Sequence, residues 1–74
     1  MEKKIIQIIS KVLKKKKIDL KDSPKTLSKW DSLGHLEIIS SLNKNFKVQI
    51  SFEDTIKIKN VKDIIKVYKK YIKE

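Results

Sequence analysis

The apolar residues in the middle of this 74-residue chain recur at intervals of three and four positions. The series consists of Leu33, Leu36, Ile39, Leu42 and Phe46. This period matches one face of an α-helix and differs from the strict alternation of a strand. We therefore predict a helix from about Ser32 to Asn45 that docks on the rest of the chain by a continuous apolar stripe.

Three further segments carry helical signals. Isoleucines and other apolar residues at helical spacing predict an amphipathic helix over residues 3–15. Ser51, with Asp54 three residues later, has the form of a capping box and begins a short helix. Asn60, with Asp63 three residues later, caps a last helix that is apolar along one side. The predicted fold class is therefore all-α, a small four-helix bundle of three main helices and one short helix.

A long first loop, from Lys16 to about Trp30, joins the first two predicted helices and is interrupted by Ser23-Pro24. The residues that we expect to pin this loop to the core are Ile18, Leu20, Leu27 and Trp30. Residues 47–50 alternate like a strand, but one isolated strand has nothing to pair with. We therefore interpret them as extended loop.

The length and composition exclude several classes of protein. Seventy-four residues form one small domain, which we expect to span residues 1–74 and to act as a monomer. With no cysteine and the single histidine His35, the chain has neither a disulfide framework nor a zinc ligand set. No apolar run exceeds two residues, which excludes integral membrane association. Residues 1–5 lack the features of a signal peptide, so we expect a cytoplasmic protein.

The net charge of +10 comes from 19 lysines, and the chain has no arginine. The charge is +7 over residues 1–29, −2 over residues 30–56 and +5 over residues 57–74. This excess leaves one alternative function open, a small lysine-rich protein that binds nucleic acid or an anionic membrane surface. Arginine is the usual residue for bidentate recognition of phosphates and bases, so its absence argues against specific nucleic-acid binding.

Ser32 lies where the polar stretch gives way to the predicted middle helix. A serine at this position is often only a helix cap. The free backbone N–H groups and the positive end of the helix dipole also suit an attached phosphate. The position of Ser32 alone does not distinguish a helix cap from a site for an attached phosphate.

The match to a known family rests on Asp31-Ser32-Leu33, the apolar register through Phe46, the pair Glu53-Asp54 and the closing residues 60–65. Together these residues resemble the acyl carrier protein family over roughly residues 27–72. In that family the matching serine receives 4′-phosphopantetheine from coenzyme A through a phosphopantetheinyl transferase. The resemblance implies that Ser32 is the attachment point in a carrier that is not an enzyme. The thiol of the attached 4′-phosphopantetheine would hold acyl or aminoacyl groups as thioesters. The carrier would present them to acyl-loading and acyl-transferring enzymes.

The resemblance also implies a recognition surface for the transferase and for later partners. Its residues would be Asp31, Leu33, Glu37, Glu53 and Asp54. The family usually carries more carboxylates late on the middle helix, where this chain has Asn43, Lys44 and Asn45. Trp30 before the Asp-Ser-Leu run also differs from the small residue common in fatty-acid carriers. Both departures favour a discrete carrier of a specialised pathway with a dedicated partner.

Other interpretations of single residues remain. His35 follows Ser32 by three positions, so a Ser–His nucleophile pair is conceivable, but no third orienting group is assigned. We interpret His35 as a surface residue near the attached arm. Tyr68 and Tyr71 could stack on bases, although their spacing on an apolar face favours packing against the core. Trp30 could equally anchor the loop in the core.

Overall fold

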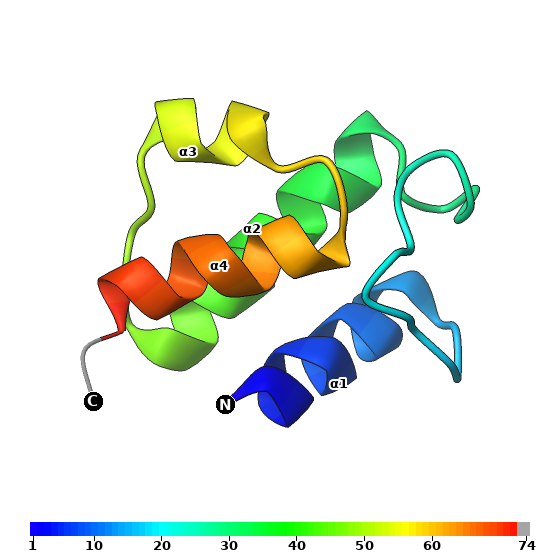
Figure 1. Cartoon of the computed structure of the whole chain (residues 1–74), viewed down its shortest axis with the longest axis horizontal. Helices are drawn as coiled ribbons and strands as arrows, with labels where there is room; N and C mark the ends of the chain where they lie inside the picture. The colour runs from blue at the N-terminus through cyan, green and yellow to red at the C-terminus, as the bar shows by residue number, and fades with distance from the viewer. Residues whose placement is uncertain (73–74) are drawn as a thin grey trace.

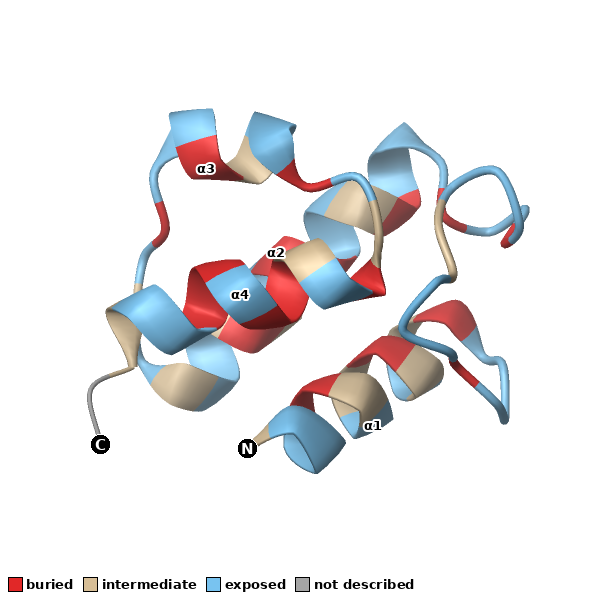
Figure 2. Ribbon diagram, in the orientation of Figure 1, coloured by how far each residue is buried: buried red, intermediate tan, exposed pale blue. Residues whose placement is uncertain are grey.

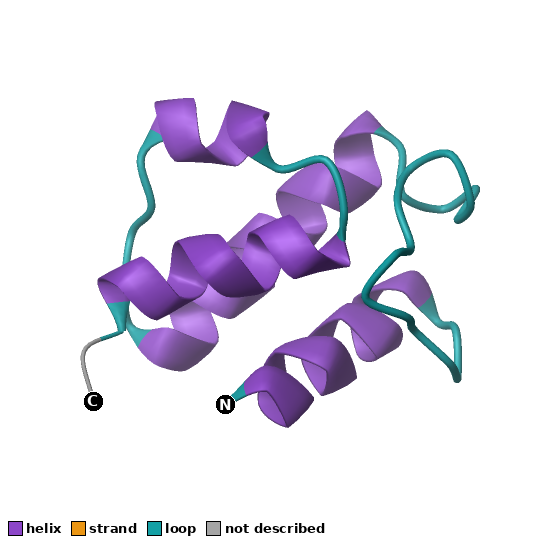
Figure 3. Ribbon diagram, in the orientation of Figure 1, coloured by secondary structure: helices purple, strands orange, loops and turns teal. Residues whose placement is uncertain are grey.

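The computed structural model describes residues 1–72, and within this range it contains four helices and no strand (Figure 3). The helices are α1 (Glu2–Leu13), α2 (Ser32–Phe46), α3 (Phe52–Lys57) and α4 (Val61–Tyr71). Helix α1 packs against both α2 and α4, whereas α3 lies across the opposite edge of the molecule from α1 (Figure 1). The predicted fold class and the long loop between the first two helices are confirmed.

The core forms where the apolar faces of α1, α2 and α4 meet (Figure 2). Its largest fully buried side chains are Trp30, Tyr68, Ile5, Ile9, Ile38, Leu42, Ile64 and Val61. Trp30 belongs to the long first loop, so the loop contributes to the same core as the helices. Burial of these large side chains supplies the main driving force for folding.

The prediction that the apolar stripe of α2 docks on the protein along its whole length is wrong at the start of the helix. Leu33 and Leu36 are 66% and 61% exposed, while Gly34, Ile38 and Leu42 are buried. The reason is the close approach of the loop to Gly34, where an added Cβ would lie 2.1 Å from the carbonyl oxygen of Lys29. This contact turns the glycine toward the protein, and the two leucines consequently face outward.

The long first loop is attached to the core by side chains and to α4 by its backbone. Ile18, Leu27 and Trp30 are buried as predicted, but Leu20 is 43% exposed, so the prediction for this side chain is wrong. The carbonyl of Leu20 instead accepts the backbone N–H of Lys62 at 3.1 Å, and the carbonyl of Asp22 accepts that of Val61 at 3.0 Å. The loop thus satisfies two N–H groups that the first turn of α4 leaves without helical partners.

Two lysines in the left-handed backbone conformation end the first two helices. Helix α1 stops at Leu13, two residues before the predicted end, because Lys14 has φ 53° and its N–H turns back to the carbonyl of Lys11. Helix α2 stops at Phe46, followed by Lys47 with φ 55°. Residues 48–50 then run as loop, as predicted. None of the described helices is long and apolar enough to cross a membrane.

The predicted caps of α3 and α4 are confirmed. The hydroxyl of Ser51 accepts the N–H of Asp54 at 3.1 Å, and the side-chain oxygen of Asn60 accepts the N–H of Asp63 at 2.8 Å. Helix α3 is unusual in that its buried residue is the carboxylate Asp54, and the helix is otherwise mostly exposed (Figure 2). The helix is therefore held by polar contacts of its own residues and by the buried side chains of Ile50 and Ile58, which flank it.

Candidate functional site

The first turn of α2 is organised by Asp31, which is the N-cap of the helix. Its side chain accepts the N–H of Gly34 at 2.8 Å, and its carbonyl accepts the N–H of His35 at 2.8 Å. Ser32 is the first residue of the helix and is exposed. Since Asp31 performs the capping, the cap interpretation of Ser32 does not hold, and the serine occupies an open position at the positive end of the helix dipole.

His35 joins three segments beneath the first turn of α2. Its Nδ1 lies 2.9 Å from the indole Nε1 of Trp30, and its Nε2 lies 3.1 Å from the carbonyl oxygen of Thr55 in α3. The indole N–H can only donate, so Nδ1 accepts and Nε2 donates, which fixes a neutral imidazole with its proton on Nε2. The planes of the Trp30 and His35 rings are nearly parallel, 12° apart, with centroids separated by 6.1 Å.

This arrangement differs from the prediction that His35 is a surface residue. The side chain is partly buried and both of its nitrogens are engaged, so it is not available to activate Ser32 as a nucleophile. The interpretation of Trp30 as a loop anchor is confirmed, because the side chain is 1% exposed.

An open groove of about 620 Å³ runs between the start of α2, helix α3 and the long first loop. Its walls are formed by Pro24, Trp30, Asp31, Ser32, His35, Leu36, Phe52, Thr55, Ile56 and Ile58. Most of these side chains are apolar, and Ser32 is one of the few polar groups among them. The groove therefore places an exposed hydroxyl beside an apolar surface.

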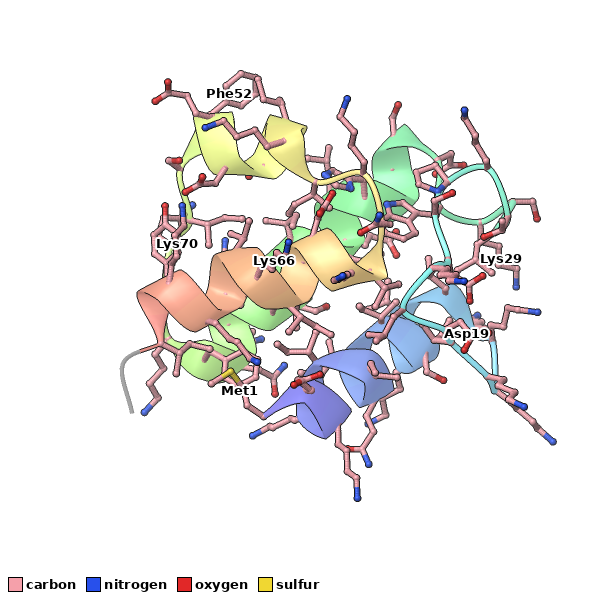
Figure 4. All side chains as sticks on the ribbon, in the orientation of Figure 1. Met1, Asp19, Lys29, Phe52, Lys66 and Lys70 are labelled. Atoms are coloured by element: carbon pink, nitrogen blue, oxygen red, sulfur yellow. The ribbon has the colours of Figure 1, made fainter. Side chains whose placement is uncertain are left out.

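Four large apolar side chains are exposed around this groove, two from each of α2 and α3. They are Leu33, Leu36, Phe52 and Ile56, with exposed fractions from 61% to 76%. Figure 4 shows Phe52 projecting from α3 away from the other helices. Neither Phe52 nor Ile56 stands out in the sequence, because a helix of six residues is too short to show which of its faces is buried.

The predicted recognition carboxylates occupy different environments. Asp31 lies beside Ser32 in the groove, Glu37 is exposed farther along α2, and Glu53 is exposed on α3. Asp54 is only 9% exposed, contrary to the expectation of an exposed side chain. The structure thus keeps three of the four carboxylates at the surface and turns the fourth inward.

The inward carboxylate of Asp54 has two partners at the end of α4. It accepts from the hydroxyl of Tyr71 at 2.6 Å and from Nζ of Lys70 at 3.2 Å. The Tyr71 hydrogen bond, followed by the bond and charge of Lys70, holds the pKa of Asp54 below its ordinary value, although burial acts in the opposite direction.

The two tyrosines of α4 pack against the protein, as the spacing favours. Tyr68 is fully buried and donates its hydroxyl to the side-chain oxygen of Asn43 at 2.8 Å, and burial raises its pKa above the ordinary value. Tyr71 is partly buried and holds Asp54. The base-stacking interpretation of this pair does not hold for Tyr68.

A family model described as "Phosphopantetheine attachment site" matches residues 3–67, which include the groove, the long first loop and most of all four helices. The chain belongs to this family. It is therefore a phosphopantetheine-dependent acyl carrier protein, a class of protein that carries substrates and is not itself catalytic. No curated protein is a significant match to this carrier protein.

Solved structures of other proteins share its fold, among them the following two. A protein of Mycobacterium tuberculosis, classed as an acyl carrier protein, is 26% identical with a TM-score of 0.87, and the match covers 96% of this chain and 97% of that one. The holo acyl carrier protein of Geobacter metallireducens is 25% identical with a TM-score of 0.84, covering 93% of this chain and 82% of that one. The carrier protein thus keeps the family fold despite its basic composition.

The residues around Ser32 fit a phosphopantetheine group. The exposed hydroxyl can form a phosphate ester, and the N-terminal end of α2 favours the negative charge of that ester. The groove beside it is wide enough and apolar enough to contact a flexible arm.

Proposed function

We propose that Ser32 is the residue of this carrier protein that receives 4′-phosphopantetheine. The observation that carries this proposal is that Asp31 caps α2, which leaves the hydroxyl of Ser32 exposed at the first position of the helix. Ser32 also lines the groove, whereas the next exposed serine of the helix, Ser40, lies two turns away. Ser32 therefore combines an exposed hydroxyl, a position at the start of the helix and a place in the wall of the groove.

In the proposed reaction a separate transferase brings coenzyme A to Ser32. The serine oxygen forms a new bond to the phosphorus next to pantetheine, the bond from that phosphorus to the adenosine bisphosphate half breaks, and the hydroxyl proton is released. The chain itself supplies the nucleophilic oxygen and the positive end of α2 near the phosphate. The terminal thiol supplied by the group then holds acyl intermediates as thioesters, which partner enzymes load and remove.

The proposed recognition surface contains Asp31, Leu33, Glu37 and Glu53, all of which are exposed, and Asp31 also lines the groove. Asp54 serves this surface indirectly, by fixing α3 to α4. The few carboxylates and the many exposed apolar side chains support a dedicated partner whose docking site is largely apolar, as expected for a discrete carrier of a specialised pathway. Docking through such a surface depends less on salt than docking through a purely acidic one.

The test of the attachment site is the intact mass after incubation with coenzyme A and a permissive phosphopantetheinyl transferase. We expect the parent and Ser40→Ala to gain one phosphopantetheine and Ser32→Ala to gain none. Ser40 is a matched control because it is an exposed serine of the same helix. Modification of Ser32→Ala, or failure of the folded parent under conditions that load a control carrier, would contradict the proposal.

We also propose that the chain works as one monomeric carrier domain over residues 1–74, because its buried residues form one continuous core. The rival function, polyanion binding, draws support from the described lysines, which are all exposed. A polyanion binder would lose affinity steeply with salt and would be insensitive to Ser32→Ala. Comparison of Ser32→Ala with Ser40→Ala therefore also separates the two functions. A carrier loses loading only in Ser32→Ala, whereas a polyanion binder is insensitive to this change.

A further inference from the structure

Among the described residues 1–72, α2 is bordered by a groove that includes Ser32 and by a second groove that does not. The groove described above contains Ser32 in its wall. The other groove, of about 560 Å³, lies on the opposite side of Leu36 and is lined by residues such as Ile39, Asn43 and Val48. A group attached to Ser32 therefore meets the first groove before it can reach the second.

The outer wall of the first groove exposes apolar surface to water. Leu36, Phe52 and Ile56 are 61%, 76% and 61% exposed, and all three contribute to this wall. In Figure 4 the side chain of Phe52 stands clear of the helices that form the core. Covering such surface with an apolar chain releases free energy in proportion to the area removed from water.

The inner wall of the same groove is closed. His35 binds Trp30 with one ring nitrogen and the carbonyl of Thr55 with the other, so a continuous bridge crosses from the first loop to α3. Behind this bridge lie fully buried core side chains such as Ile38 and Leu42. A chain that entered the core through this wall would have to break both hydrogen bonds and leave a buried indole N–H without a partner.

We propose that an apolar acyl chain on the Ser32 arm folds back over this outer groove, and that His35 is the positioning residue that keeps the chain out of the core. This proposal rests on the assignment of Ser32 as the attachment site. The cargo is thereby covered on one side by Leu36, Phe52 and Ile56 and stays accessible to a partner enzyme on the other. His35 acts by fixing α3 relative to Trp30, which sets the width of the groove.

The test uses the isotopically labelled protein, loaded with octanoyl-coenzyme A by a permissive transferase and verified by intact mass. Methyl and aromatic NMR spectra of the octanoyl form are compared with those of the form that carries the arm alone. We expect shifts at Leu36, Phe52 and Ile56 and no shifts at Ile38 and Leu42. Failure of the protein to load would count against Ser32 as the attachment site. Once the protein is loaded, the spectra test whether the acyl chain lies in the outer groove.

Matched variants sharpen the comparison. Ile56→Ser removes an exposed aliphatic wall of the groove and should reduce the octanoyl-dependent shifts. Leu20→Ser removes an exposed aliphatic side chain of the first loop, outside the groove, and should leave them unchanged. His35→Ala should spread the shifts into core residues such as Ile38. His35→Gln, which keeps one donor and one acceptor, should restore the parent pattern at least in part.

Three outcomes would overturn the proposal. Shifts of core methyl groups in the loaded parent would place the cargo inside the bundle. Shifts confined to the methyl groups of Ile39 and Val48 would place it in the second groove. An octanoyl form whose spectrum equals that of the arm alone would place the cargo in solvent. The parent protein alone decides among these outcomes, so the conclusion does not depend on the folding of His35→Ala.

Discussion

The hydroxyl oxygen of Tyr71 lies 2.6 Å from a carboxylate oxygen of Asp54, and the same hydroxyl accepts the backbone N–H of Ser51 at 3.0 Å. One phenol at the end of α4 thus holds both the cap and the first turn of α3. With the second attachment between His35 and Thr55, these polar contacts fix a helix that buries little apolar surface. The position of α3, and with it one wall of the groove, therefore depends on these hydrogen bonds as well as on the buried Ile50 and Ile58 that flank the helix.

The first prediction concerns stability in acid. The pKa of Asp54 is lower in the folded protein than in the unfolded chain, where it is about 3.9. The folded state therefore binds fewer protons there, and the contribution of Asp54 to stability is present above about pH 4 and is lost as the pH falls through the folded pKa. We expect Asp54→Asn to be less stable than the parent at pH 7 and to lose less stability on acidification below pH 4. Urea denaturation across this range measures the difference.

A control variant for this experiment is Asp19→Asn, which removes an exposed carboxylate of the first loop. Its stability should follow that of the parent through the same pH range. Tyr71→Phe should resemble Asp54→Asn, since it removes the first cause of the lowered pKa. Parallel acid profiles for the parent and Asp54→Asn would show that this contact does not stabilise the fold.

The second prediction concerns Gly34. In most helices, replacing glycine by alanine stabilises the protein by about 1 kcal/mol. Here the new Cβ would lie 2.1 Å from the carbonyl oxygen of Lys29, which is backbone and has little freedom to move. We expect Gly34→Ala to reverse the usual sign and to destabilise by roughly 1–3 kcal/mol.

Urea denaturation checks this prediction, with Ser40→Ala as the control at an exposed position of the same helix. That control should change the free energy of unfolding by no more than about 0.5 kcal/mol. A Gly34→Ala protein as stable as the parent would mean that the loop approaches α2 less closely than the structure indicates.

The third prediction distinguishes the capping role of Asp31 from its proposed role in recognition by the transferase. Asparagine caps helices about as well as aspartate, so Asp31→Asn should keep the stability of the parent, whereas Asp31→Ala should lose about 1 kcal/mol. If the charge of Asp31 steers the transferase, both variants should raise the KM for loading Ser32 to a similar extent. Loading kinetics at low and moderate salt measure this, and an unchanged KM in Asp31→Asn would assign Asp31 to capping alone.

The fourth prediction concerns the lysines of α4. Lys62 and Lys66 are exposed and lie one turn apart, with Lys66 on the outer face of the helix (Figure 4). Replacing both by glutamine should leave the rate of Ser32 loading unchanged and weaken retention on a DNA column. The salt dependence of that retention should become shallower, by a log–log slope of up to about 2. A large loss of loading would place the basic face in the carrier interface.

The sequence predicted those parts of the fold that local signals determine. Ser51 and Asn60 cap their helices as expected, because a cap depends on residues only three positions apart. The end of α1 was misplaced because Lys14 takes the left-handed conformation that glycine usually provides. The outward position of Leu33 and Leu36 followed from a contact between Gly34 and the loop, which the periodicity of α2 does not reveal.

The same distinction between local signals and long-range contacts applies to the residues of the candidate site. The positions of Asp31 and Ser32 at the start of α2 could be predicted, because the change from a polar stretch to a helical pattern is visible in the sequence. The roles of His35 and Asp54 were missed because each depends on a partner far along the chain, Thr55 for the histidine and Tyr71 for the aspartate. Long-range pairs of this kind leave no local pattern in a single sequence.

Trp30 is the only tryptophan of the chain, it lies in the wall of the groove beside Ser32, and its indole N–H is bound to His35 at 2.9 Å. Indole fluorescence responds to hydrogen bonding and to neighbouring groups, and here it arises from this one position. The protein therefore contains its own optical reporter in the groove beside Ser32, the proposed attachment site. Loading, exchange and release of thioesters could be followed in real time on the unlabelled carrier, without a coupled enzyme assay.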